Sequence, residues 1–67
     1  MAVLKVLELL SSSEKSWEDA AQLAVKQASK SVRGIRSVNI SNMSAVVQKG
    51  KIVEYRVNAK LSFEIER

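Results

Sequence analysis

The last part of the chain alternates apolar and polar residues more regularly than any other stretch of the sequence. From Val53 to Ile65 every odd position is apolar, and from Glu54 to Glu66 every even position is polar. A period of two places the odd side chains on one face of a β-strand, whereas a helix would scatter them around its axis. The pattern therefore predicts a long strand over Ile52–Glu66 with one apolar face.

The length of this predicted strand exceeds what a chain of this size can enclose. Val53 to Ile65 spans roughly 40 Å at about 3.3 Å per residue, whereas a compact chain of 67 residues has a diameter of only about 28 Å. Long strands with uncovered edges tend to aggregate. We therefore expect the strand to curl around a helix and to pass into a contact with another subunit.

The beginning of the chain predicts a second strand, over Ala2–Leu10, that is apolar on both faces. Such a pattern is typical of a strand that is covered on both sides. We expect one face to pack against a helix and the other to need a second cover, for which another subunit is a candidate. Ser11–Lys15 then forms a polar connection.

The next segment has the periodicity of an amphipathic helix. Ser16 is a candidate N-cap, with Asp19 three residues later as a variant of the capping box. Lys30 and Arg33 would lie in the last turn and Gly34 at the C′ position, which gives a helix of about 17 residues. Apolar residues recur at spacings of three and four: Trp17, Ala21, Ala24, Ala28 and Val32. The alanines would allow the helix to approach a sheet closely.

Arg36–Val47 predicts a strand whose apolar positions change parity half-way along. A β-bulge near Ser41–Asn42 would restore one apolar face. Gln48–Lys51 contains a glycine and predicts a hairpin loop. The order of elements predicts an α+β fold: a single domain over residues 1–67 with a β-α-β-β order, in which a three-stranded antiparallel sheet wraps around one helix.

Composition favours self-association and disfavours catalysis. Cysteine and histidine are absent, which excludes disulfides, Cys/His zinc sites and the commonest bases and nucleophiles. The serines lack a G-x-S-x-G context, and Gly34 and Gly50 form no phosphate-binding loop. We therefore expect that this protein is not an enzyme. Because the free energy from burying this small core roughly balances the entropy of ordering the chain, we expect an oligomer.

Charge adds little about partners. The net charge of +4 comes from 11 basic and 7 acidic residues, and the basic residues are dispersed, which does not favour nucleic acid. Neither a targeting segment nor a membrane span is evident. We therefore expect a cytoplasmic protein with no membrane partner.

Two features carry candidate binding chemistry. Glu54, Glu64 and Glu66 share one face of the last strand, where they would bind a hard cation such as calcium if symmetry brought copies together; the alternative is a solvated polar face. Trp17 would either stack on a ligand or, as we expect, pack on the core.

The sequence resembles the dodecins. The resemblance is carried by Val3–Leu10, the serine-rich turn and Ser16–Ala21, and it extends over about residues 2 to 66. Further matching segments are Ala28-Ser29-Lys30, Gly34-Ile35-Arg36, Tyr55-Arg56-Val57 and Leu61-Ser62-Phe63. Dodecins are small proteins in which twelve β-α-β-β subunits form a hollow shell. The resemblance therefore implies a homododecamer.

The resemblance also implies a ligand. Many dodecins bind flavin (FMN, FAD or riboflavin) between tryptophans, with a glutamine at the ring edge; here Ser37 and Arg56 occupy these positions. Arg56 can still stack on a flavin ring, but the chain is more similar to a calcium-associated subgroup that lacks the tryptophan. The implied function is a non-catalytic shell that binds or sequesters small ligands, and the alternative is a structural or calcium-buffering assembly.

Overall fold

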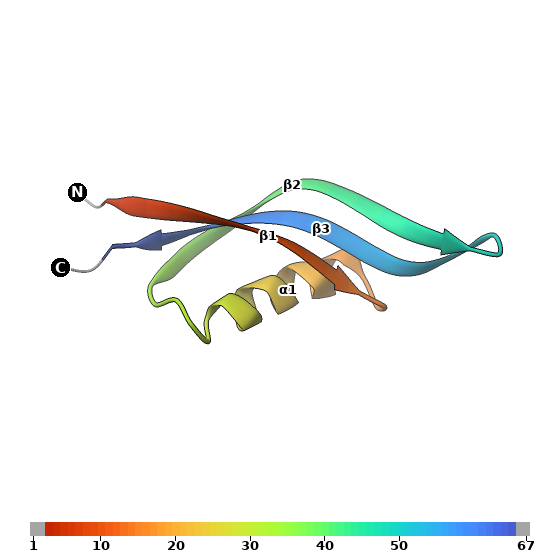
Figure 1. Ribbon diagram of the computed structural model, residues 1–67, viewed down its shortest axis with the longest axis horizontal. Helices are drawn as coiled ribbons and strands as arrows, with labels where there is room; N and C mark the ends of the chain where they lie inside the picture. Colours follow the sequence, from red (N-terminus) through yellow and green to blue (C-terminus); the bar gives the residue numbers. More distant parts are fainter. Residues whose placement is uncertain (1–2, 66–67) are drawn as a thin grey trace.

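The chain forms a three-stranded antiparallel sheet with one helix against a single face (Figure 1). The computed structural model describes residues 3–65. Its elements are β1 (Leu4–Ser13), α1 (Trp17–Ala28), β2 (Ile35–Gln48) and β3 (Lys51–Glu64). The strand order is β1-β3-β2. The predicted β-α-β-β fold is confirmed.

The strand with the most regular alternation, β3, is the central strand of the sheet. It pairs with β1 in a continuous register that sets Leu7 opposite Leu61 and Leu9 opposite Ala59. Because alternate side chains face alternate sides, the odd residues of β3 point toward α1. Val57, Ala59 and Leu61 are buried there. Glu66, the predicted end of the strand, lies outside the described residues.

Small side chains allow α1 to lie close to the sheet. Ala20, Ala24 and Ala28 are the buried residues of the helix and recur every four positions along one side. Ala24 and Ala28 belong to the same buried cluster as Ala59 and Leu61. Among residues 3–65, no helix is long and apolar enough to cross a membrane.

The helix begins where predicted but ends earlier. The Ser16 hydroxyl accepts a hydrogen bond from the Asp19 N–H at 2.9 Å, which is the predicted N-cap. However, α1 has 12 residues and ends at Ala28, not in the turn that contains Lys30 and Arg33. The Ser29 hydroxyl bonds the Val25 carbonyl at 2.7 Å, and such side-chain bonding competes with helix continuation.

Gly34 therefore does not terminate the helix. It lies five residues beyond the C-cap at Ser29, with φ +73°, a backbone conformation that favours glycine. Its carbonyl accepts a hydrogen bond from the Glu64 N–H at 3.1 Å. Gly34 thus makes the first backbone contact with β3, immediately before β2 begins.

The first strand extends farther than predicted, through part of the serine-rich segment. The residue after the predicted end, Ser11, pairs with Val57, and the strand continues to Ser13. Ser13 is buried, and its hydroxyl donates to the Asp19 carboxylate at 2.6 Å. The Asp19 side chain therefore ties β1 to the first turn of α1, where a negative charge also suits the helix dipole.

The two long strands form a hairpin arm that passes beyond α1 (Figure 1). Its turn has φ +53° at Lys49 and +75° at Gly50, as in a type I′ hairpin turn. The predicted bulge is confirmed by a register shift between Ile40 and Asn42. The molecule measures 51 × 20 × 13 Å, so the expected projection of the strands beyond a compact domain is also confirmed.

Replacing the N-cap tests this account of where the helix begins. Ser16→Ala removes the acceptor for the Asp19 N–H and should lower the free energy of unfolding by about 1 kcal/mol. Ser16→Asp keeps an acceptor and serves as the matched control. Its free energy of unfolding should fall by only a few tenths of the loss in Ser16→Ala. Denaturant unfolding at one protein concentration measures both. Equal losses would show that the cap bond does not stabilise the helix.

Candidate functional site

The sheet has an open face, defined here as the side turned away from α1. On β3 this face carries only polar side chains: Glu54, Arg56, Asn58, Lys60, Ser62 and Glu64. The neighbouring strand β1 adds Leu10 opposite Asn58 and Val6 opposite Ser62. Leu10 and Val6 are each more than 60% exposed. The open face is therefore polar along its centre, and its β1 edge carries exposed apolar side chains together with Glu8 and Ser12.

The two residues predicted to contact a cofactor lie on the open face but not beside each other. Ser37 pairs with Ser62, whereas Arg56 pairs with Ser44. Arg56 and Ser62 are six positions apart along β3, which corresponds to roughly 20 Å. The Ser37 hydroxyl is hydrogen-bonded to that of Ser62. One chain therefore does not bring both predicted residues to a common ligand.

Two of the predicted metal ligands, Glu54 and Glu64, are also separate and already paired with cations, and the third, Glu66, lies outside the described residues. The Arg56 Nε donates to Glu54 at 3.1 Å, and Arg36 forms an ion pair with Glu64. Glu54 and Glu64 are ten positions apart along β3, which corresponds to about 33 Å. Over residues 3–65, no group of three or more acidic side chains is placed to hold a metal ion. Any shared site for Glu54 and Glu64 requires more than one copy of the chain.

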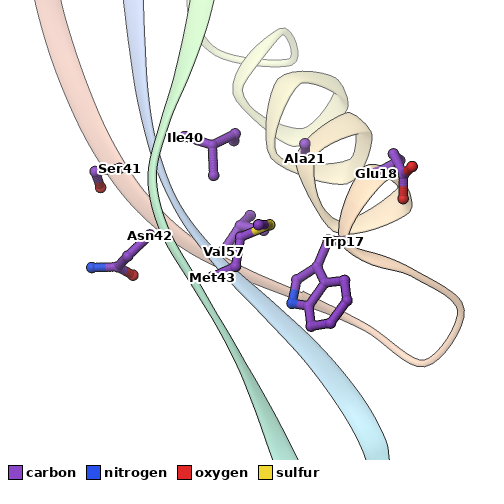
Figure 2. Close-up of a pocket in the computed structure, with 8 residues that line it drawn as sticks. All are labelled: Trp17, Glu18, Ala21, Ile40, Ser41, Asn42, Met43 and Val57. Carbon is purple, nitrogen blue, oxygen red and sulfur yellow. The ribbon is translucent and has the colours of Figure 1, made fainter.

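A hollow of about 550 Å³ lies on the other side of the sheet, between the start of α1 and β2 (Figure 2). Its lining is mainly apolar: Trp17, Glu18, Ala21, Ile40, Ser41, Asn42, Met43 and Val57. A hollow of this size lies within the usual range for small-molecule sites, about 300–1,000 Å³. The sequence signals for it were Trp17 at the helix start and apolar residues on both sides of the predicted bulge.

Trp17 is held at the edge of this hollow by two contacts. Its indole N–H donates to the Ser44 carbonyl at 2.9 Å, and its ring meets Tyr55 edge-on with centroids 4.9 Å apart. Edge-to-face geometry is favourable for aromatic pairs. Trp17 therefore joins α1 to the hairpin arm. It has the expected structural contacts, but it makes them with β2 and β3 and does not belong to the buried core cluster.

The bulge that shapes this hollow is held by side-chain hydrogen bonds. The Ser41 hydroxyl donates to the Asn58 carbonyl at 3.2 Å, and the Asn58 amide donates to Asn42 at 2.9 Å. These bonds occupy polar groups next to the extra residue, which a bulge leaves outside the regular ladder. The bend in β2 is consequently fixed relative to β3.

Comparison with known proteins gives one consistent answer. The family model described as dodecin matches residues 3–66. The calcium dodecin of Mycobacterium tuberculosis is 34% identical over 65 residues, which is 97% of this chain and 92% of that protein. Among solved structures, a mutant of the Thermus thermophilus dodecin matches with a TM-score of 0.94 and 27% identity, covering all of both chains.

A second solved structure is similar in sequence as well as fold. The crystal structure of the calcium dodecin from Mycobacterium tuberculosis matches with a TM-score of 0.82 and 36% identity, covering 97% of this chain and 93% of that one. That protein is described as a calcium-chelating antigen with a novel calcium-binding site.

The contacts of Trp17 give a testable expectation. Trp17→Phe keeps an aromatic ring but removes the donor to the Ser44 carbonyl. The free energy of unfolding should therefore fall by about 0.5–1.5 kcal/mol. Trp17→Ala also removes the contact with Tyr55 and should cost more. Equilibrium unfolding followed by far-UV circular dichroism measures both, because most of this signal comes from the backbone. Equal stability of wild type and Trp17→Phe would contradict the bridging role.

Proposed function

Because this chain belongs to the dodecin family, we propose that it is a non-catalytic subunit of a homododecameric shell that binds or sequesters small ligands. The main observation in favour of such an assembly is the amount of apolar surface that lies outside the core. Among residues 3–65, only Leu61 and Val57 are large and fully buried. In the described part of the chain, ten large hydrophobic residues are exposed: Val3, Leu4, Val6, Leu10, Val38, Met43, Val47, Ile52, Val53 and Ile65.

The placement of these exposed residues supports contacts between copies rather than scattered surface positions. Val6 and Leu10 lie on the open face of β1, whereas Met43, Val47 and Ile52 lie along the hairpin arm. Small domains commonly compensate for a small core by oligomerisation. A repeated, closed arrangement of identical subunits would cover both regions. The number twelve follows the resemblance to the dodecins.

Calcium is the ligand that we place first. The supporting observations are the calcium dodecin relative, which is 34% identical, and the carboxylates of Glu54 and Glu64 on the open face. Calcium takes six to eight oxygen ligands, more than these two separated side chains supply within one chain. The proposed site is therefore built by symmetry-related copies, and Glu66, which lies outside the described residues, remains a candidate ligand.

Flavin is the second ligand class, with Ser37 and Arg56 as the proposed contacts. Within residues 3–65, the aromatic side chains Trp17, Tyr55 and Phe63 all lie on the α1 side of the sheet or in the helix itself. The described part of the open face therefore offers no aromatic ring for stacking. Flavin binding there would depend on stacking by Arg56, and this is why we place calcium before flavin.

The assembly is tested by native mass spectrometry of the wild type and one matched pair of variants. Twelve copies of a 7.4 kDa chain give an expected mass of about 89 kDa for a closed assembly. Leu10→Asp introduces a charge at an exposed apolar position, which should dissociate the shell if another copy covers it. Ser12→Asp, exposed two residues further along the same face, is the control and should stay assembled. A monomeric wild type would contradict the proposal.

Calcium binding is tested by thermal unfolding with calcium and with a chelator. A ligand present at 100 times its dissociation constant stabilises by about 2.7 kcal/mol, so calcium should raise Tm by several degrees. Glu54→Gln and Glu64→Gln should reduce this calcium-dependent rise, and Glu14→Gln in the β1–α1 connection is the control. The rise is compared rather than Tm itself, because Glu64→Gln also removes the pair with Arg36. An identical Tm with calcium and chelator would count against a calcium site.

A further inference from the structure

A second hollow lies at the opposite end of α1 from Trp17, where the loop after the helix meets the first residues of β1 and the last of β3. Its volume is about 370 Å³. Figure 1 shows this loop at the same end of the molecule as the start of β1 and the end of β3. Its lining residues are Lys5, Ser31, Val32, Arg33, Phe63, Glu64 and Ile65. We propose that this hollow binds a phosphate monoester attached to an aromatic ring.

The charges around the hollow favour an anion. Lys5 and Arg33 both line it, and among residues 3–65 neither forms an ion pair with an acidic side chain. The acidic residue in the lining, Glu64, is paired with Arg36. Two available cations suit a phosphate monoester, which carries close to two negative charges at neutral pH. A carboxylate carries only one.

The surrounding sequence adds to this bias. Between Asp19 and Glu54 the chain contains no acidic residue but six basic ones: Lys26, Lys30, Arg33, Arg36, Lys49 and Lys51. Four of the six lie in the last turn of α1, in the following loop or at the start of β2. Summed charge of one sign raises the local concentration of an oppositely charged ligand.

The end of the helix does not cancel this effect. The C-terminal carbonyls of a helix carry partial negative charge that repels an anion. Here backbone N–H groups of the loop bond to several of them: Ser31 and Val32 donate to the Ala28 carbonyl at 3.1 and 2.9 Å, and Lys30 donates to Gln27 at 3.2 Å. These bonds reduce the exposed negative potential beside the hollow.

The apolar part of the lining favours a ring over inorganic phosphate. Val32, Phe63 and Ile65 contribute apolar side chains, and Phe63 is half-buried with part of its surface open. An aromatic ring can pack against the Phe63 ring in an edge-to-face or offset-stacked arrangement. Arg33 and Lys5 would hold the phosphate, and the Ser31 hydroxyl can donate a further hydrogen bond.

Most of this site lies on the side of the sheet that faces α1, where Lys5 pairs with Phe63, and Glu64 is the residue that it shares with the open face. The inference deepens the proposed function, since it assigns a ligand class to a small-molecule-binding shell. It rests on the proposed function only in that the protein is expected to be assembled when binding is measured. The two can therefore fail independently.

The test is isothermal titration of the purified wild-type protein with 1-naphthyl phosphate, with the assembly state of the same samples measured by native mass spectrometry. Three matched probes separate the parts of the ligand: 1-naphthol lacks the charge, inorganic phosphate lacks the ring, and 1-naphthoate carries a single charge. We expect each of the three to bind at least about tenfold more weakly than 1-naphthyl phosphate.

Variants locate the site. Arg33→Gln and Lys5→Gln should each weaken binding about tenfold, in line with the loss of one charge-assisted hydrogen bond. Phe63→Leu should weaken binding of naphthyl phosphate but not of phosphate. Lys26→Gln removes a helix cation that does not line the hollow and should leave the affinity within twofold. Arg33→Lys, which keeps the charge, should recover part of the loss.

Several results would overturn the inference. Equal affinity for 1-naphthol would show an apolar site without anion recognition, and equal affinity for 1-naphthoate would remove the assignment to a phosphate monoester. Equal losses in Arg33→Gln and Lys26→Gln would show general charge attraction. An assembled shell that does not bind the probe overturns this inference and leaves the proposed assembly intact. A monomer that binds it overturns the assembly alone.

Discussion

The close approach of α1 to the centre of the sheet is the contact on which the rest of the structure depends. Ala24 and Ala28 meet Ala59 and Leu61 of the central strand in one buried cluster. Alanine lets two backbones lie near each other, and it loses no side-chain entropy on burial. It also contributes little apolar area. The contact therefore orients the helix precisely enough to define the fold but leaves most large hydrophobic side chains without a place inside it.

The same constraint explains the shape of the molecule. A helix of 12 residues is about 18 Å long at 1.5 Å per residue, whereas each long strand has 14 residues and spans roughly 46 Å. The helix can cover only part of the sheet. The hairpin arm beyond it is stabilised by backbone pairing, by its turn and by the contacts of Trp17, and its apolar residues remain available to another copy.

Much of this architecture could be predicted because it is encoded by local patterns. The alternation in β3 identified the buried face, the change of parity in β2 located the bulge, and Ser16 marked the beginning of α1. The end of α1 could not be predicted in the same way, because the apolar period continues to Val32 while the chain must turn back to start β2. The serine-rich pattern predicts a loop at Ser13, but the structure differs, because the burial of this residue depends on Asp19, a partner six positions away.

The candidate site was less predictable, for a related physical reason. Alternation assigns Glu54, Arg56 and Glu64 to one face, and the structure places them there, but a shared face does not mean a short distance. Along an extended strand, each pair of residues adds almost 7 Å, so side chains with suitable chemistry are soon too far apart to share a ligand. A sheet of this length brings such groups together only by meeting copies of itself. The hollow beside Lys5 and Arg33 differs in this respect, because three segments distant in sequence converge there within one chain.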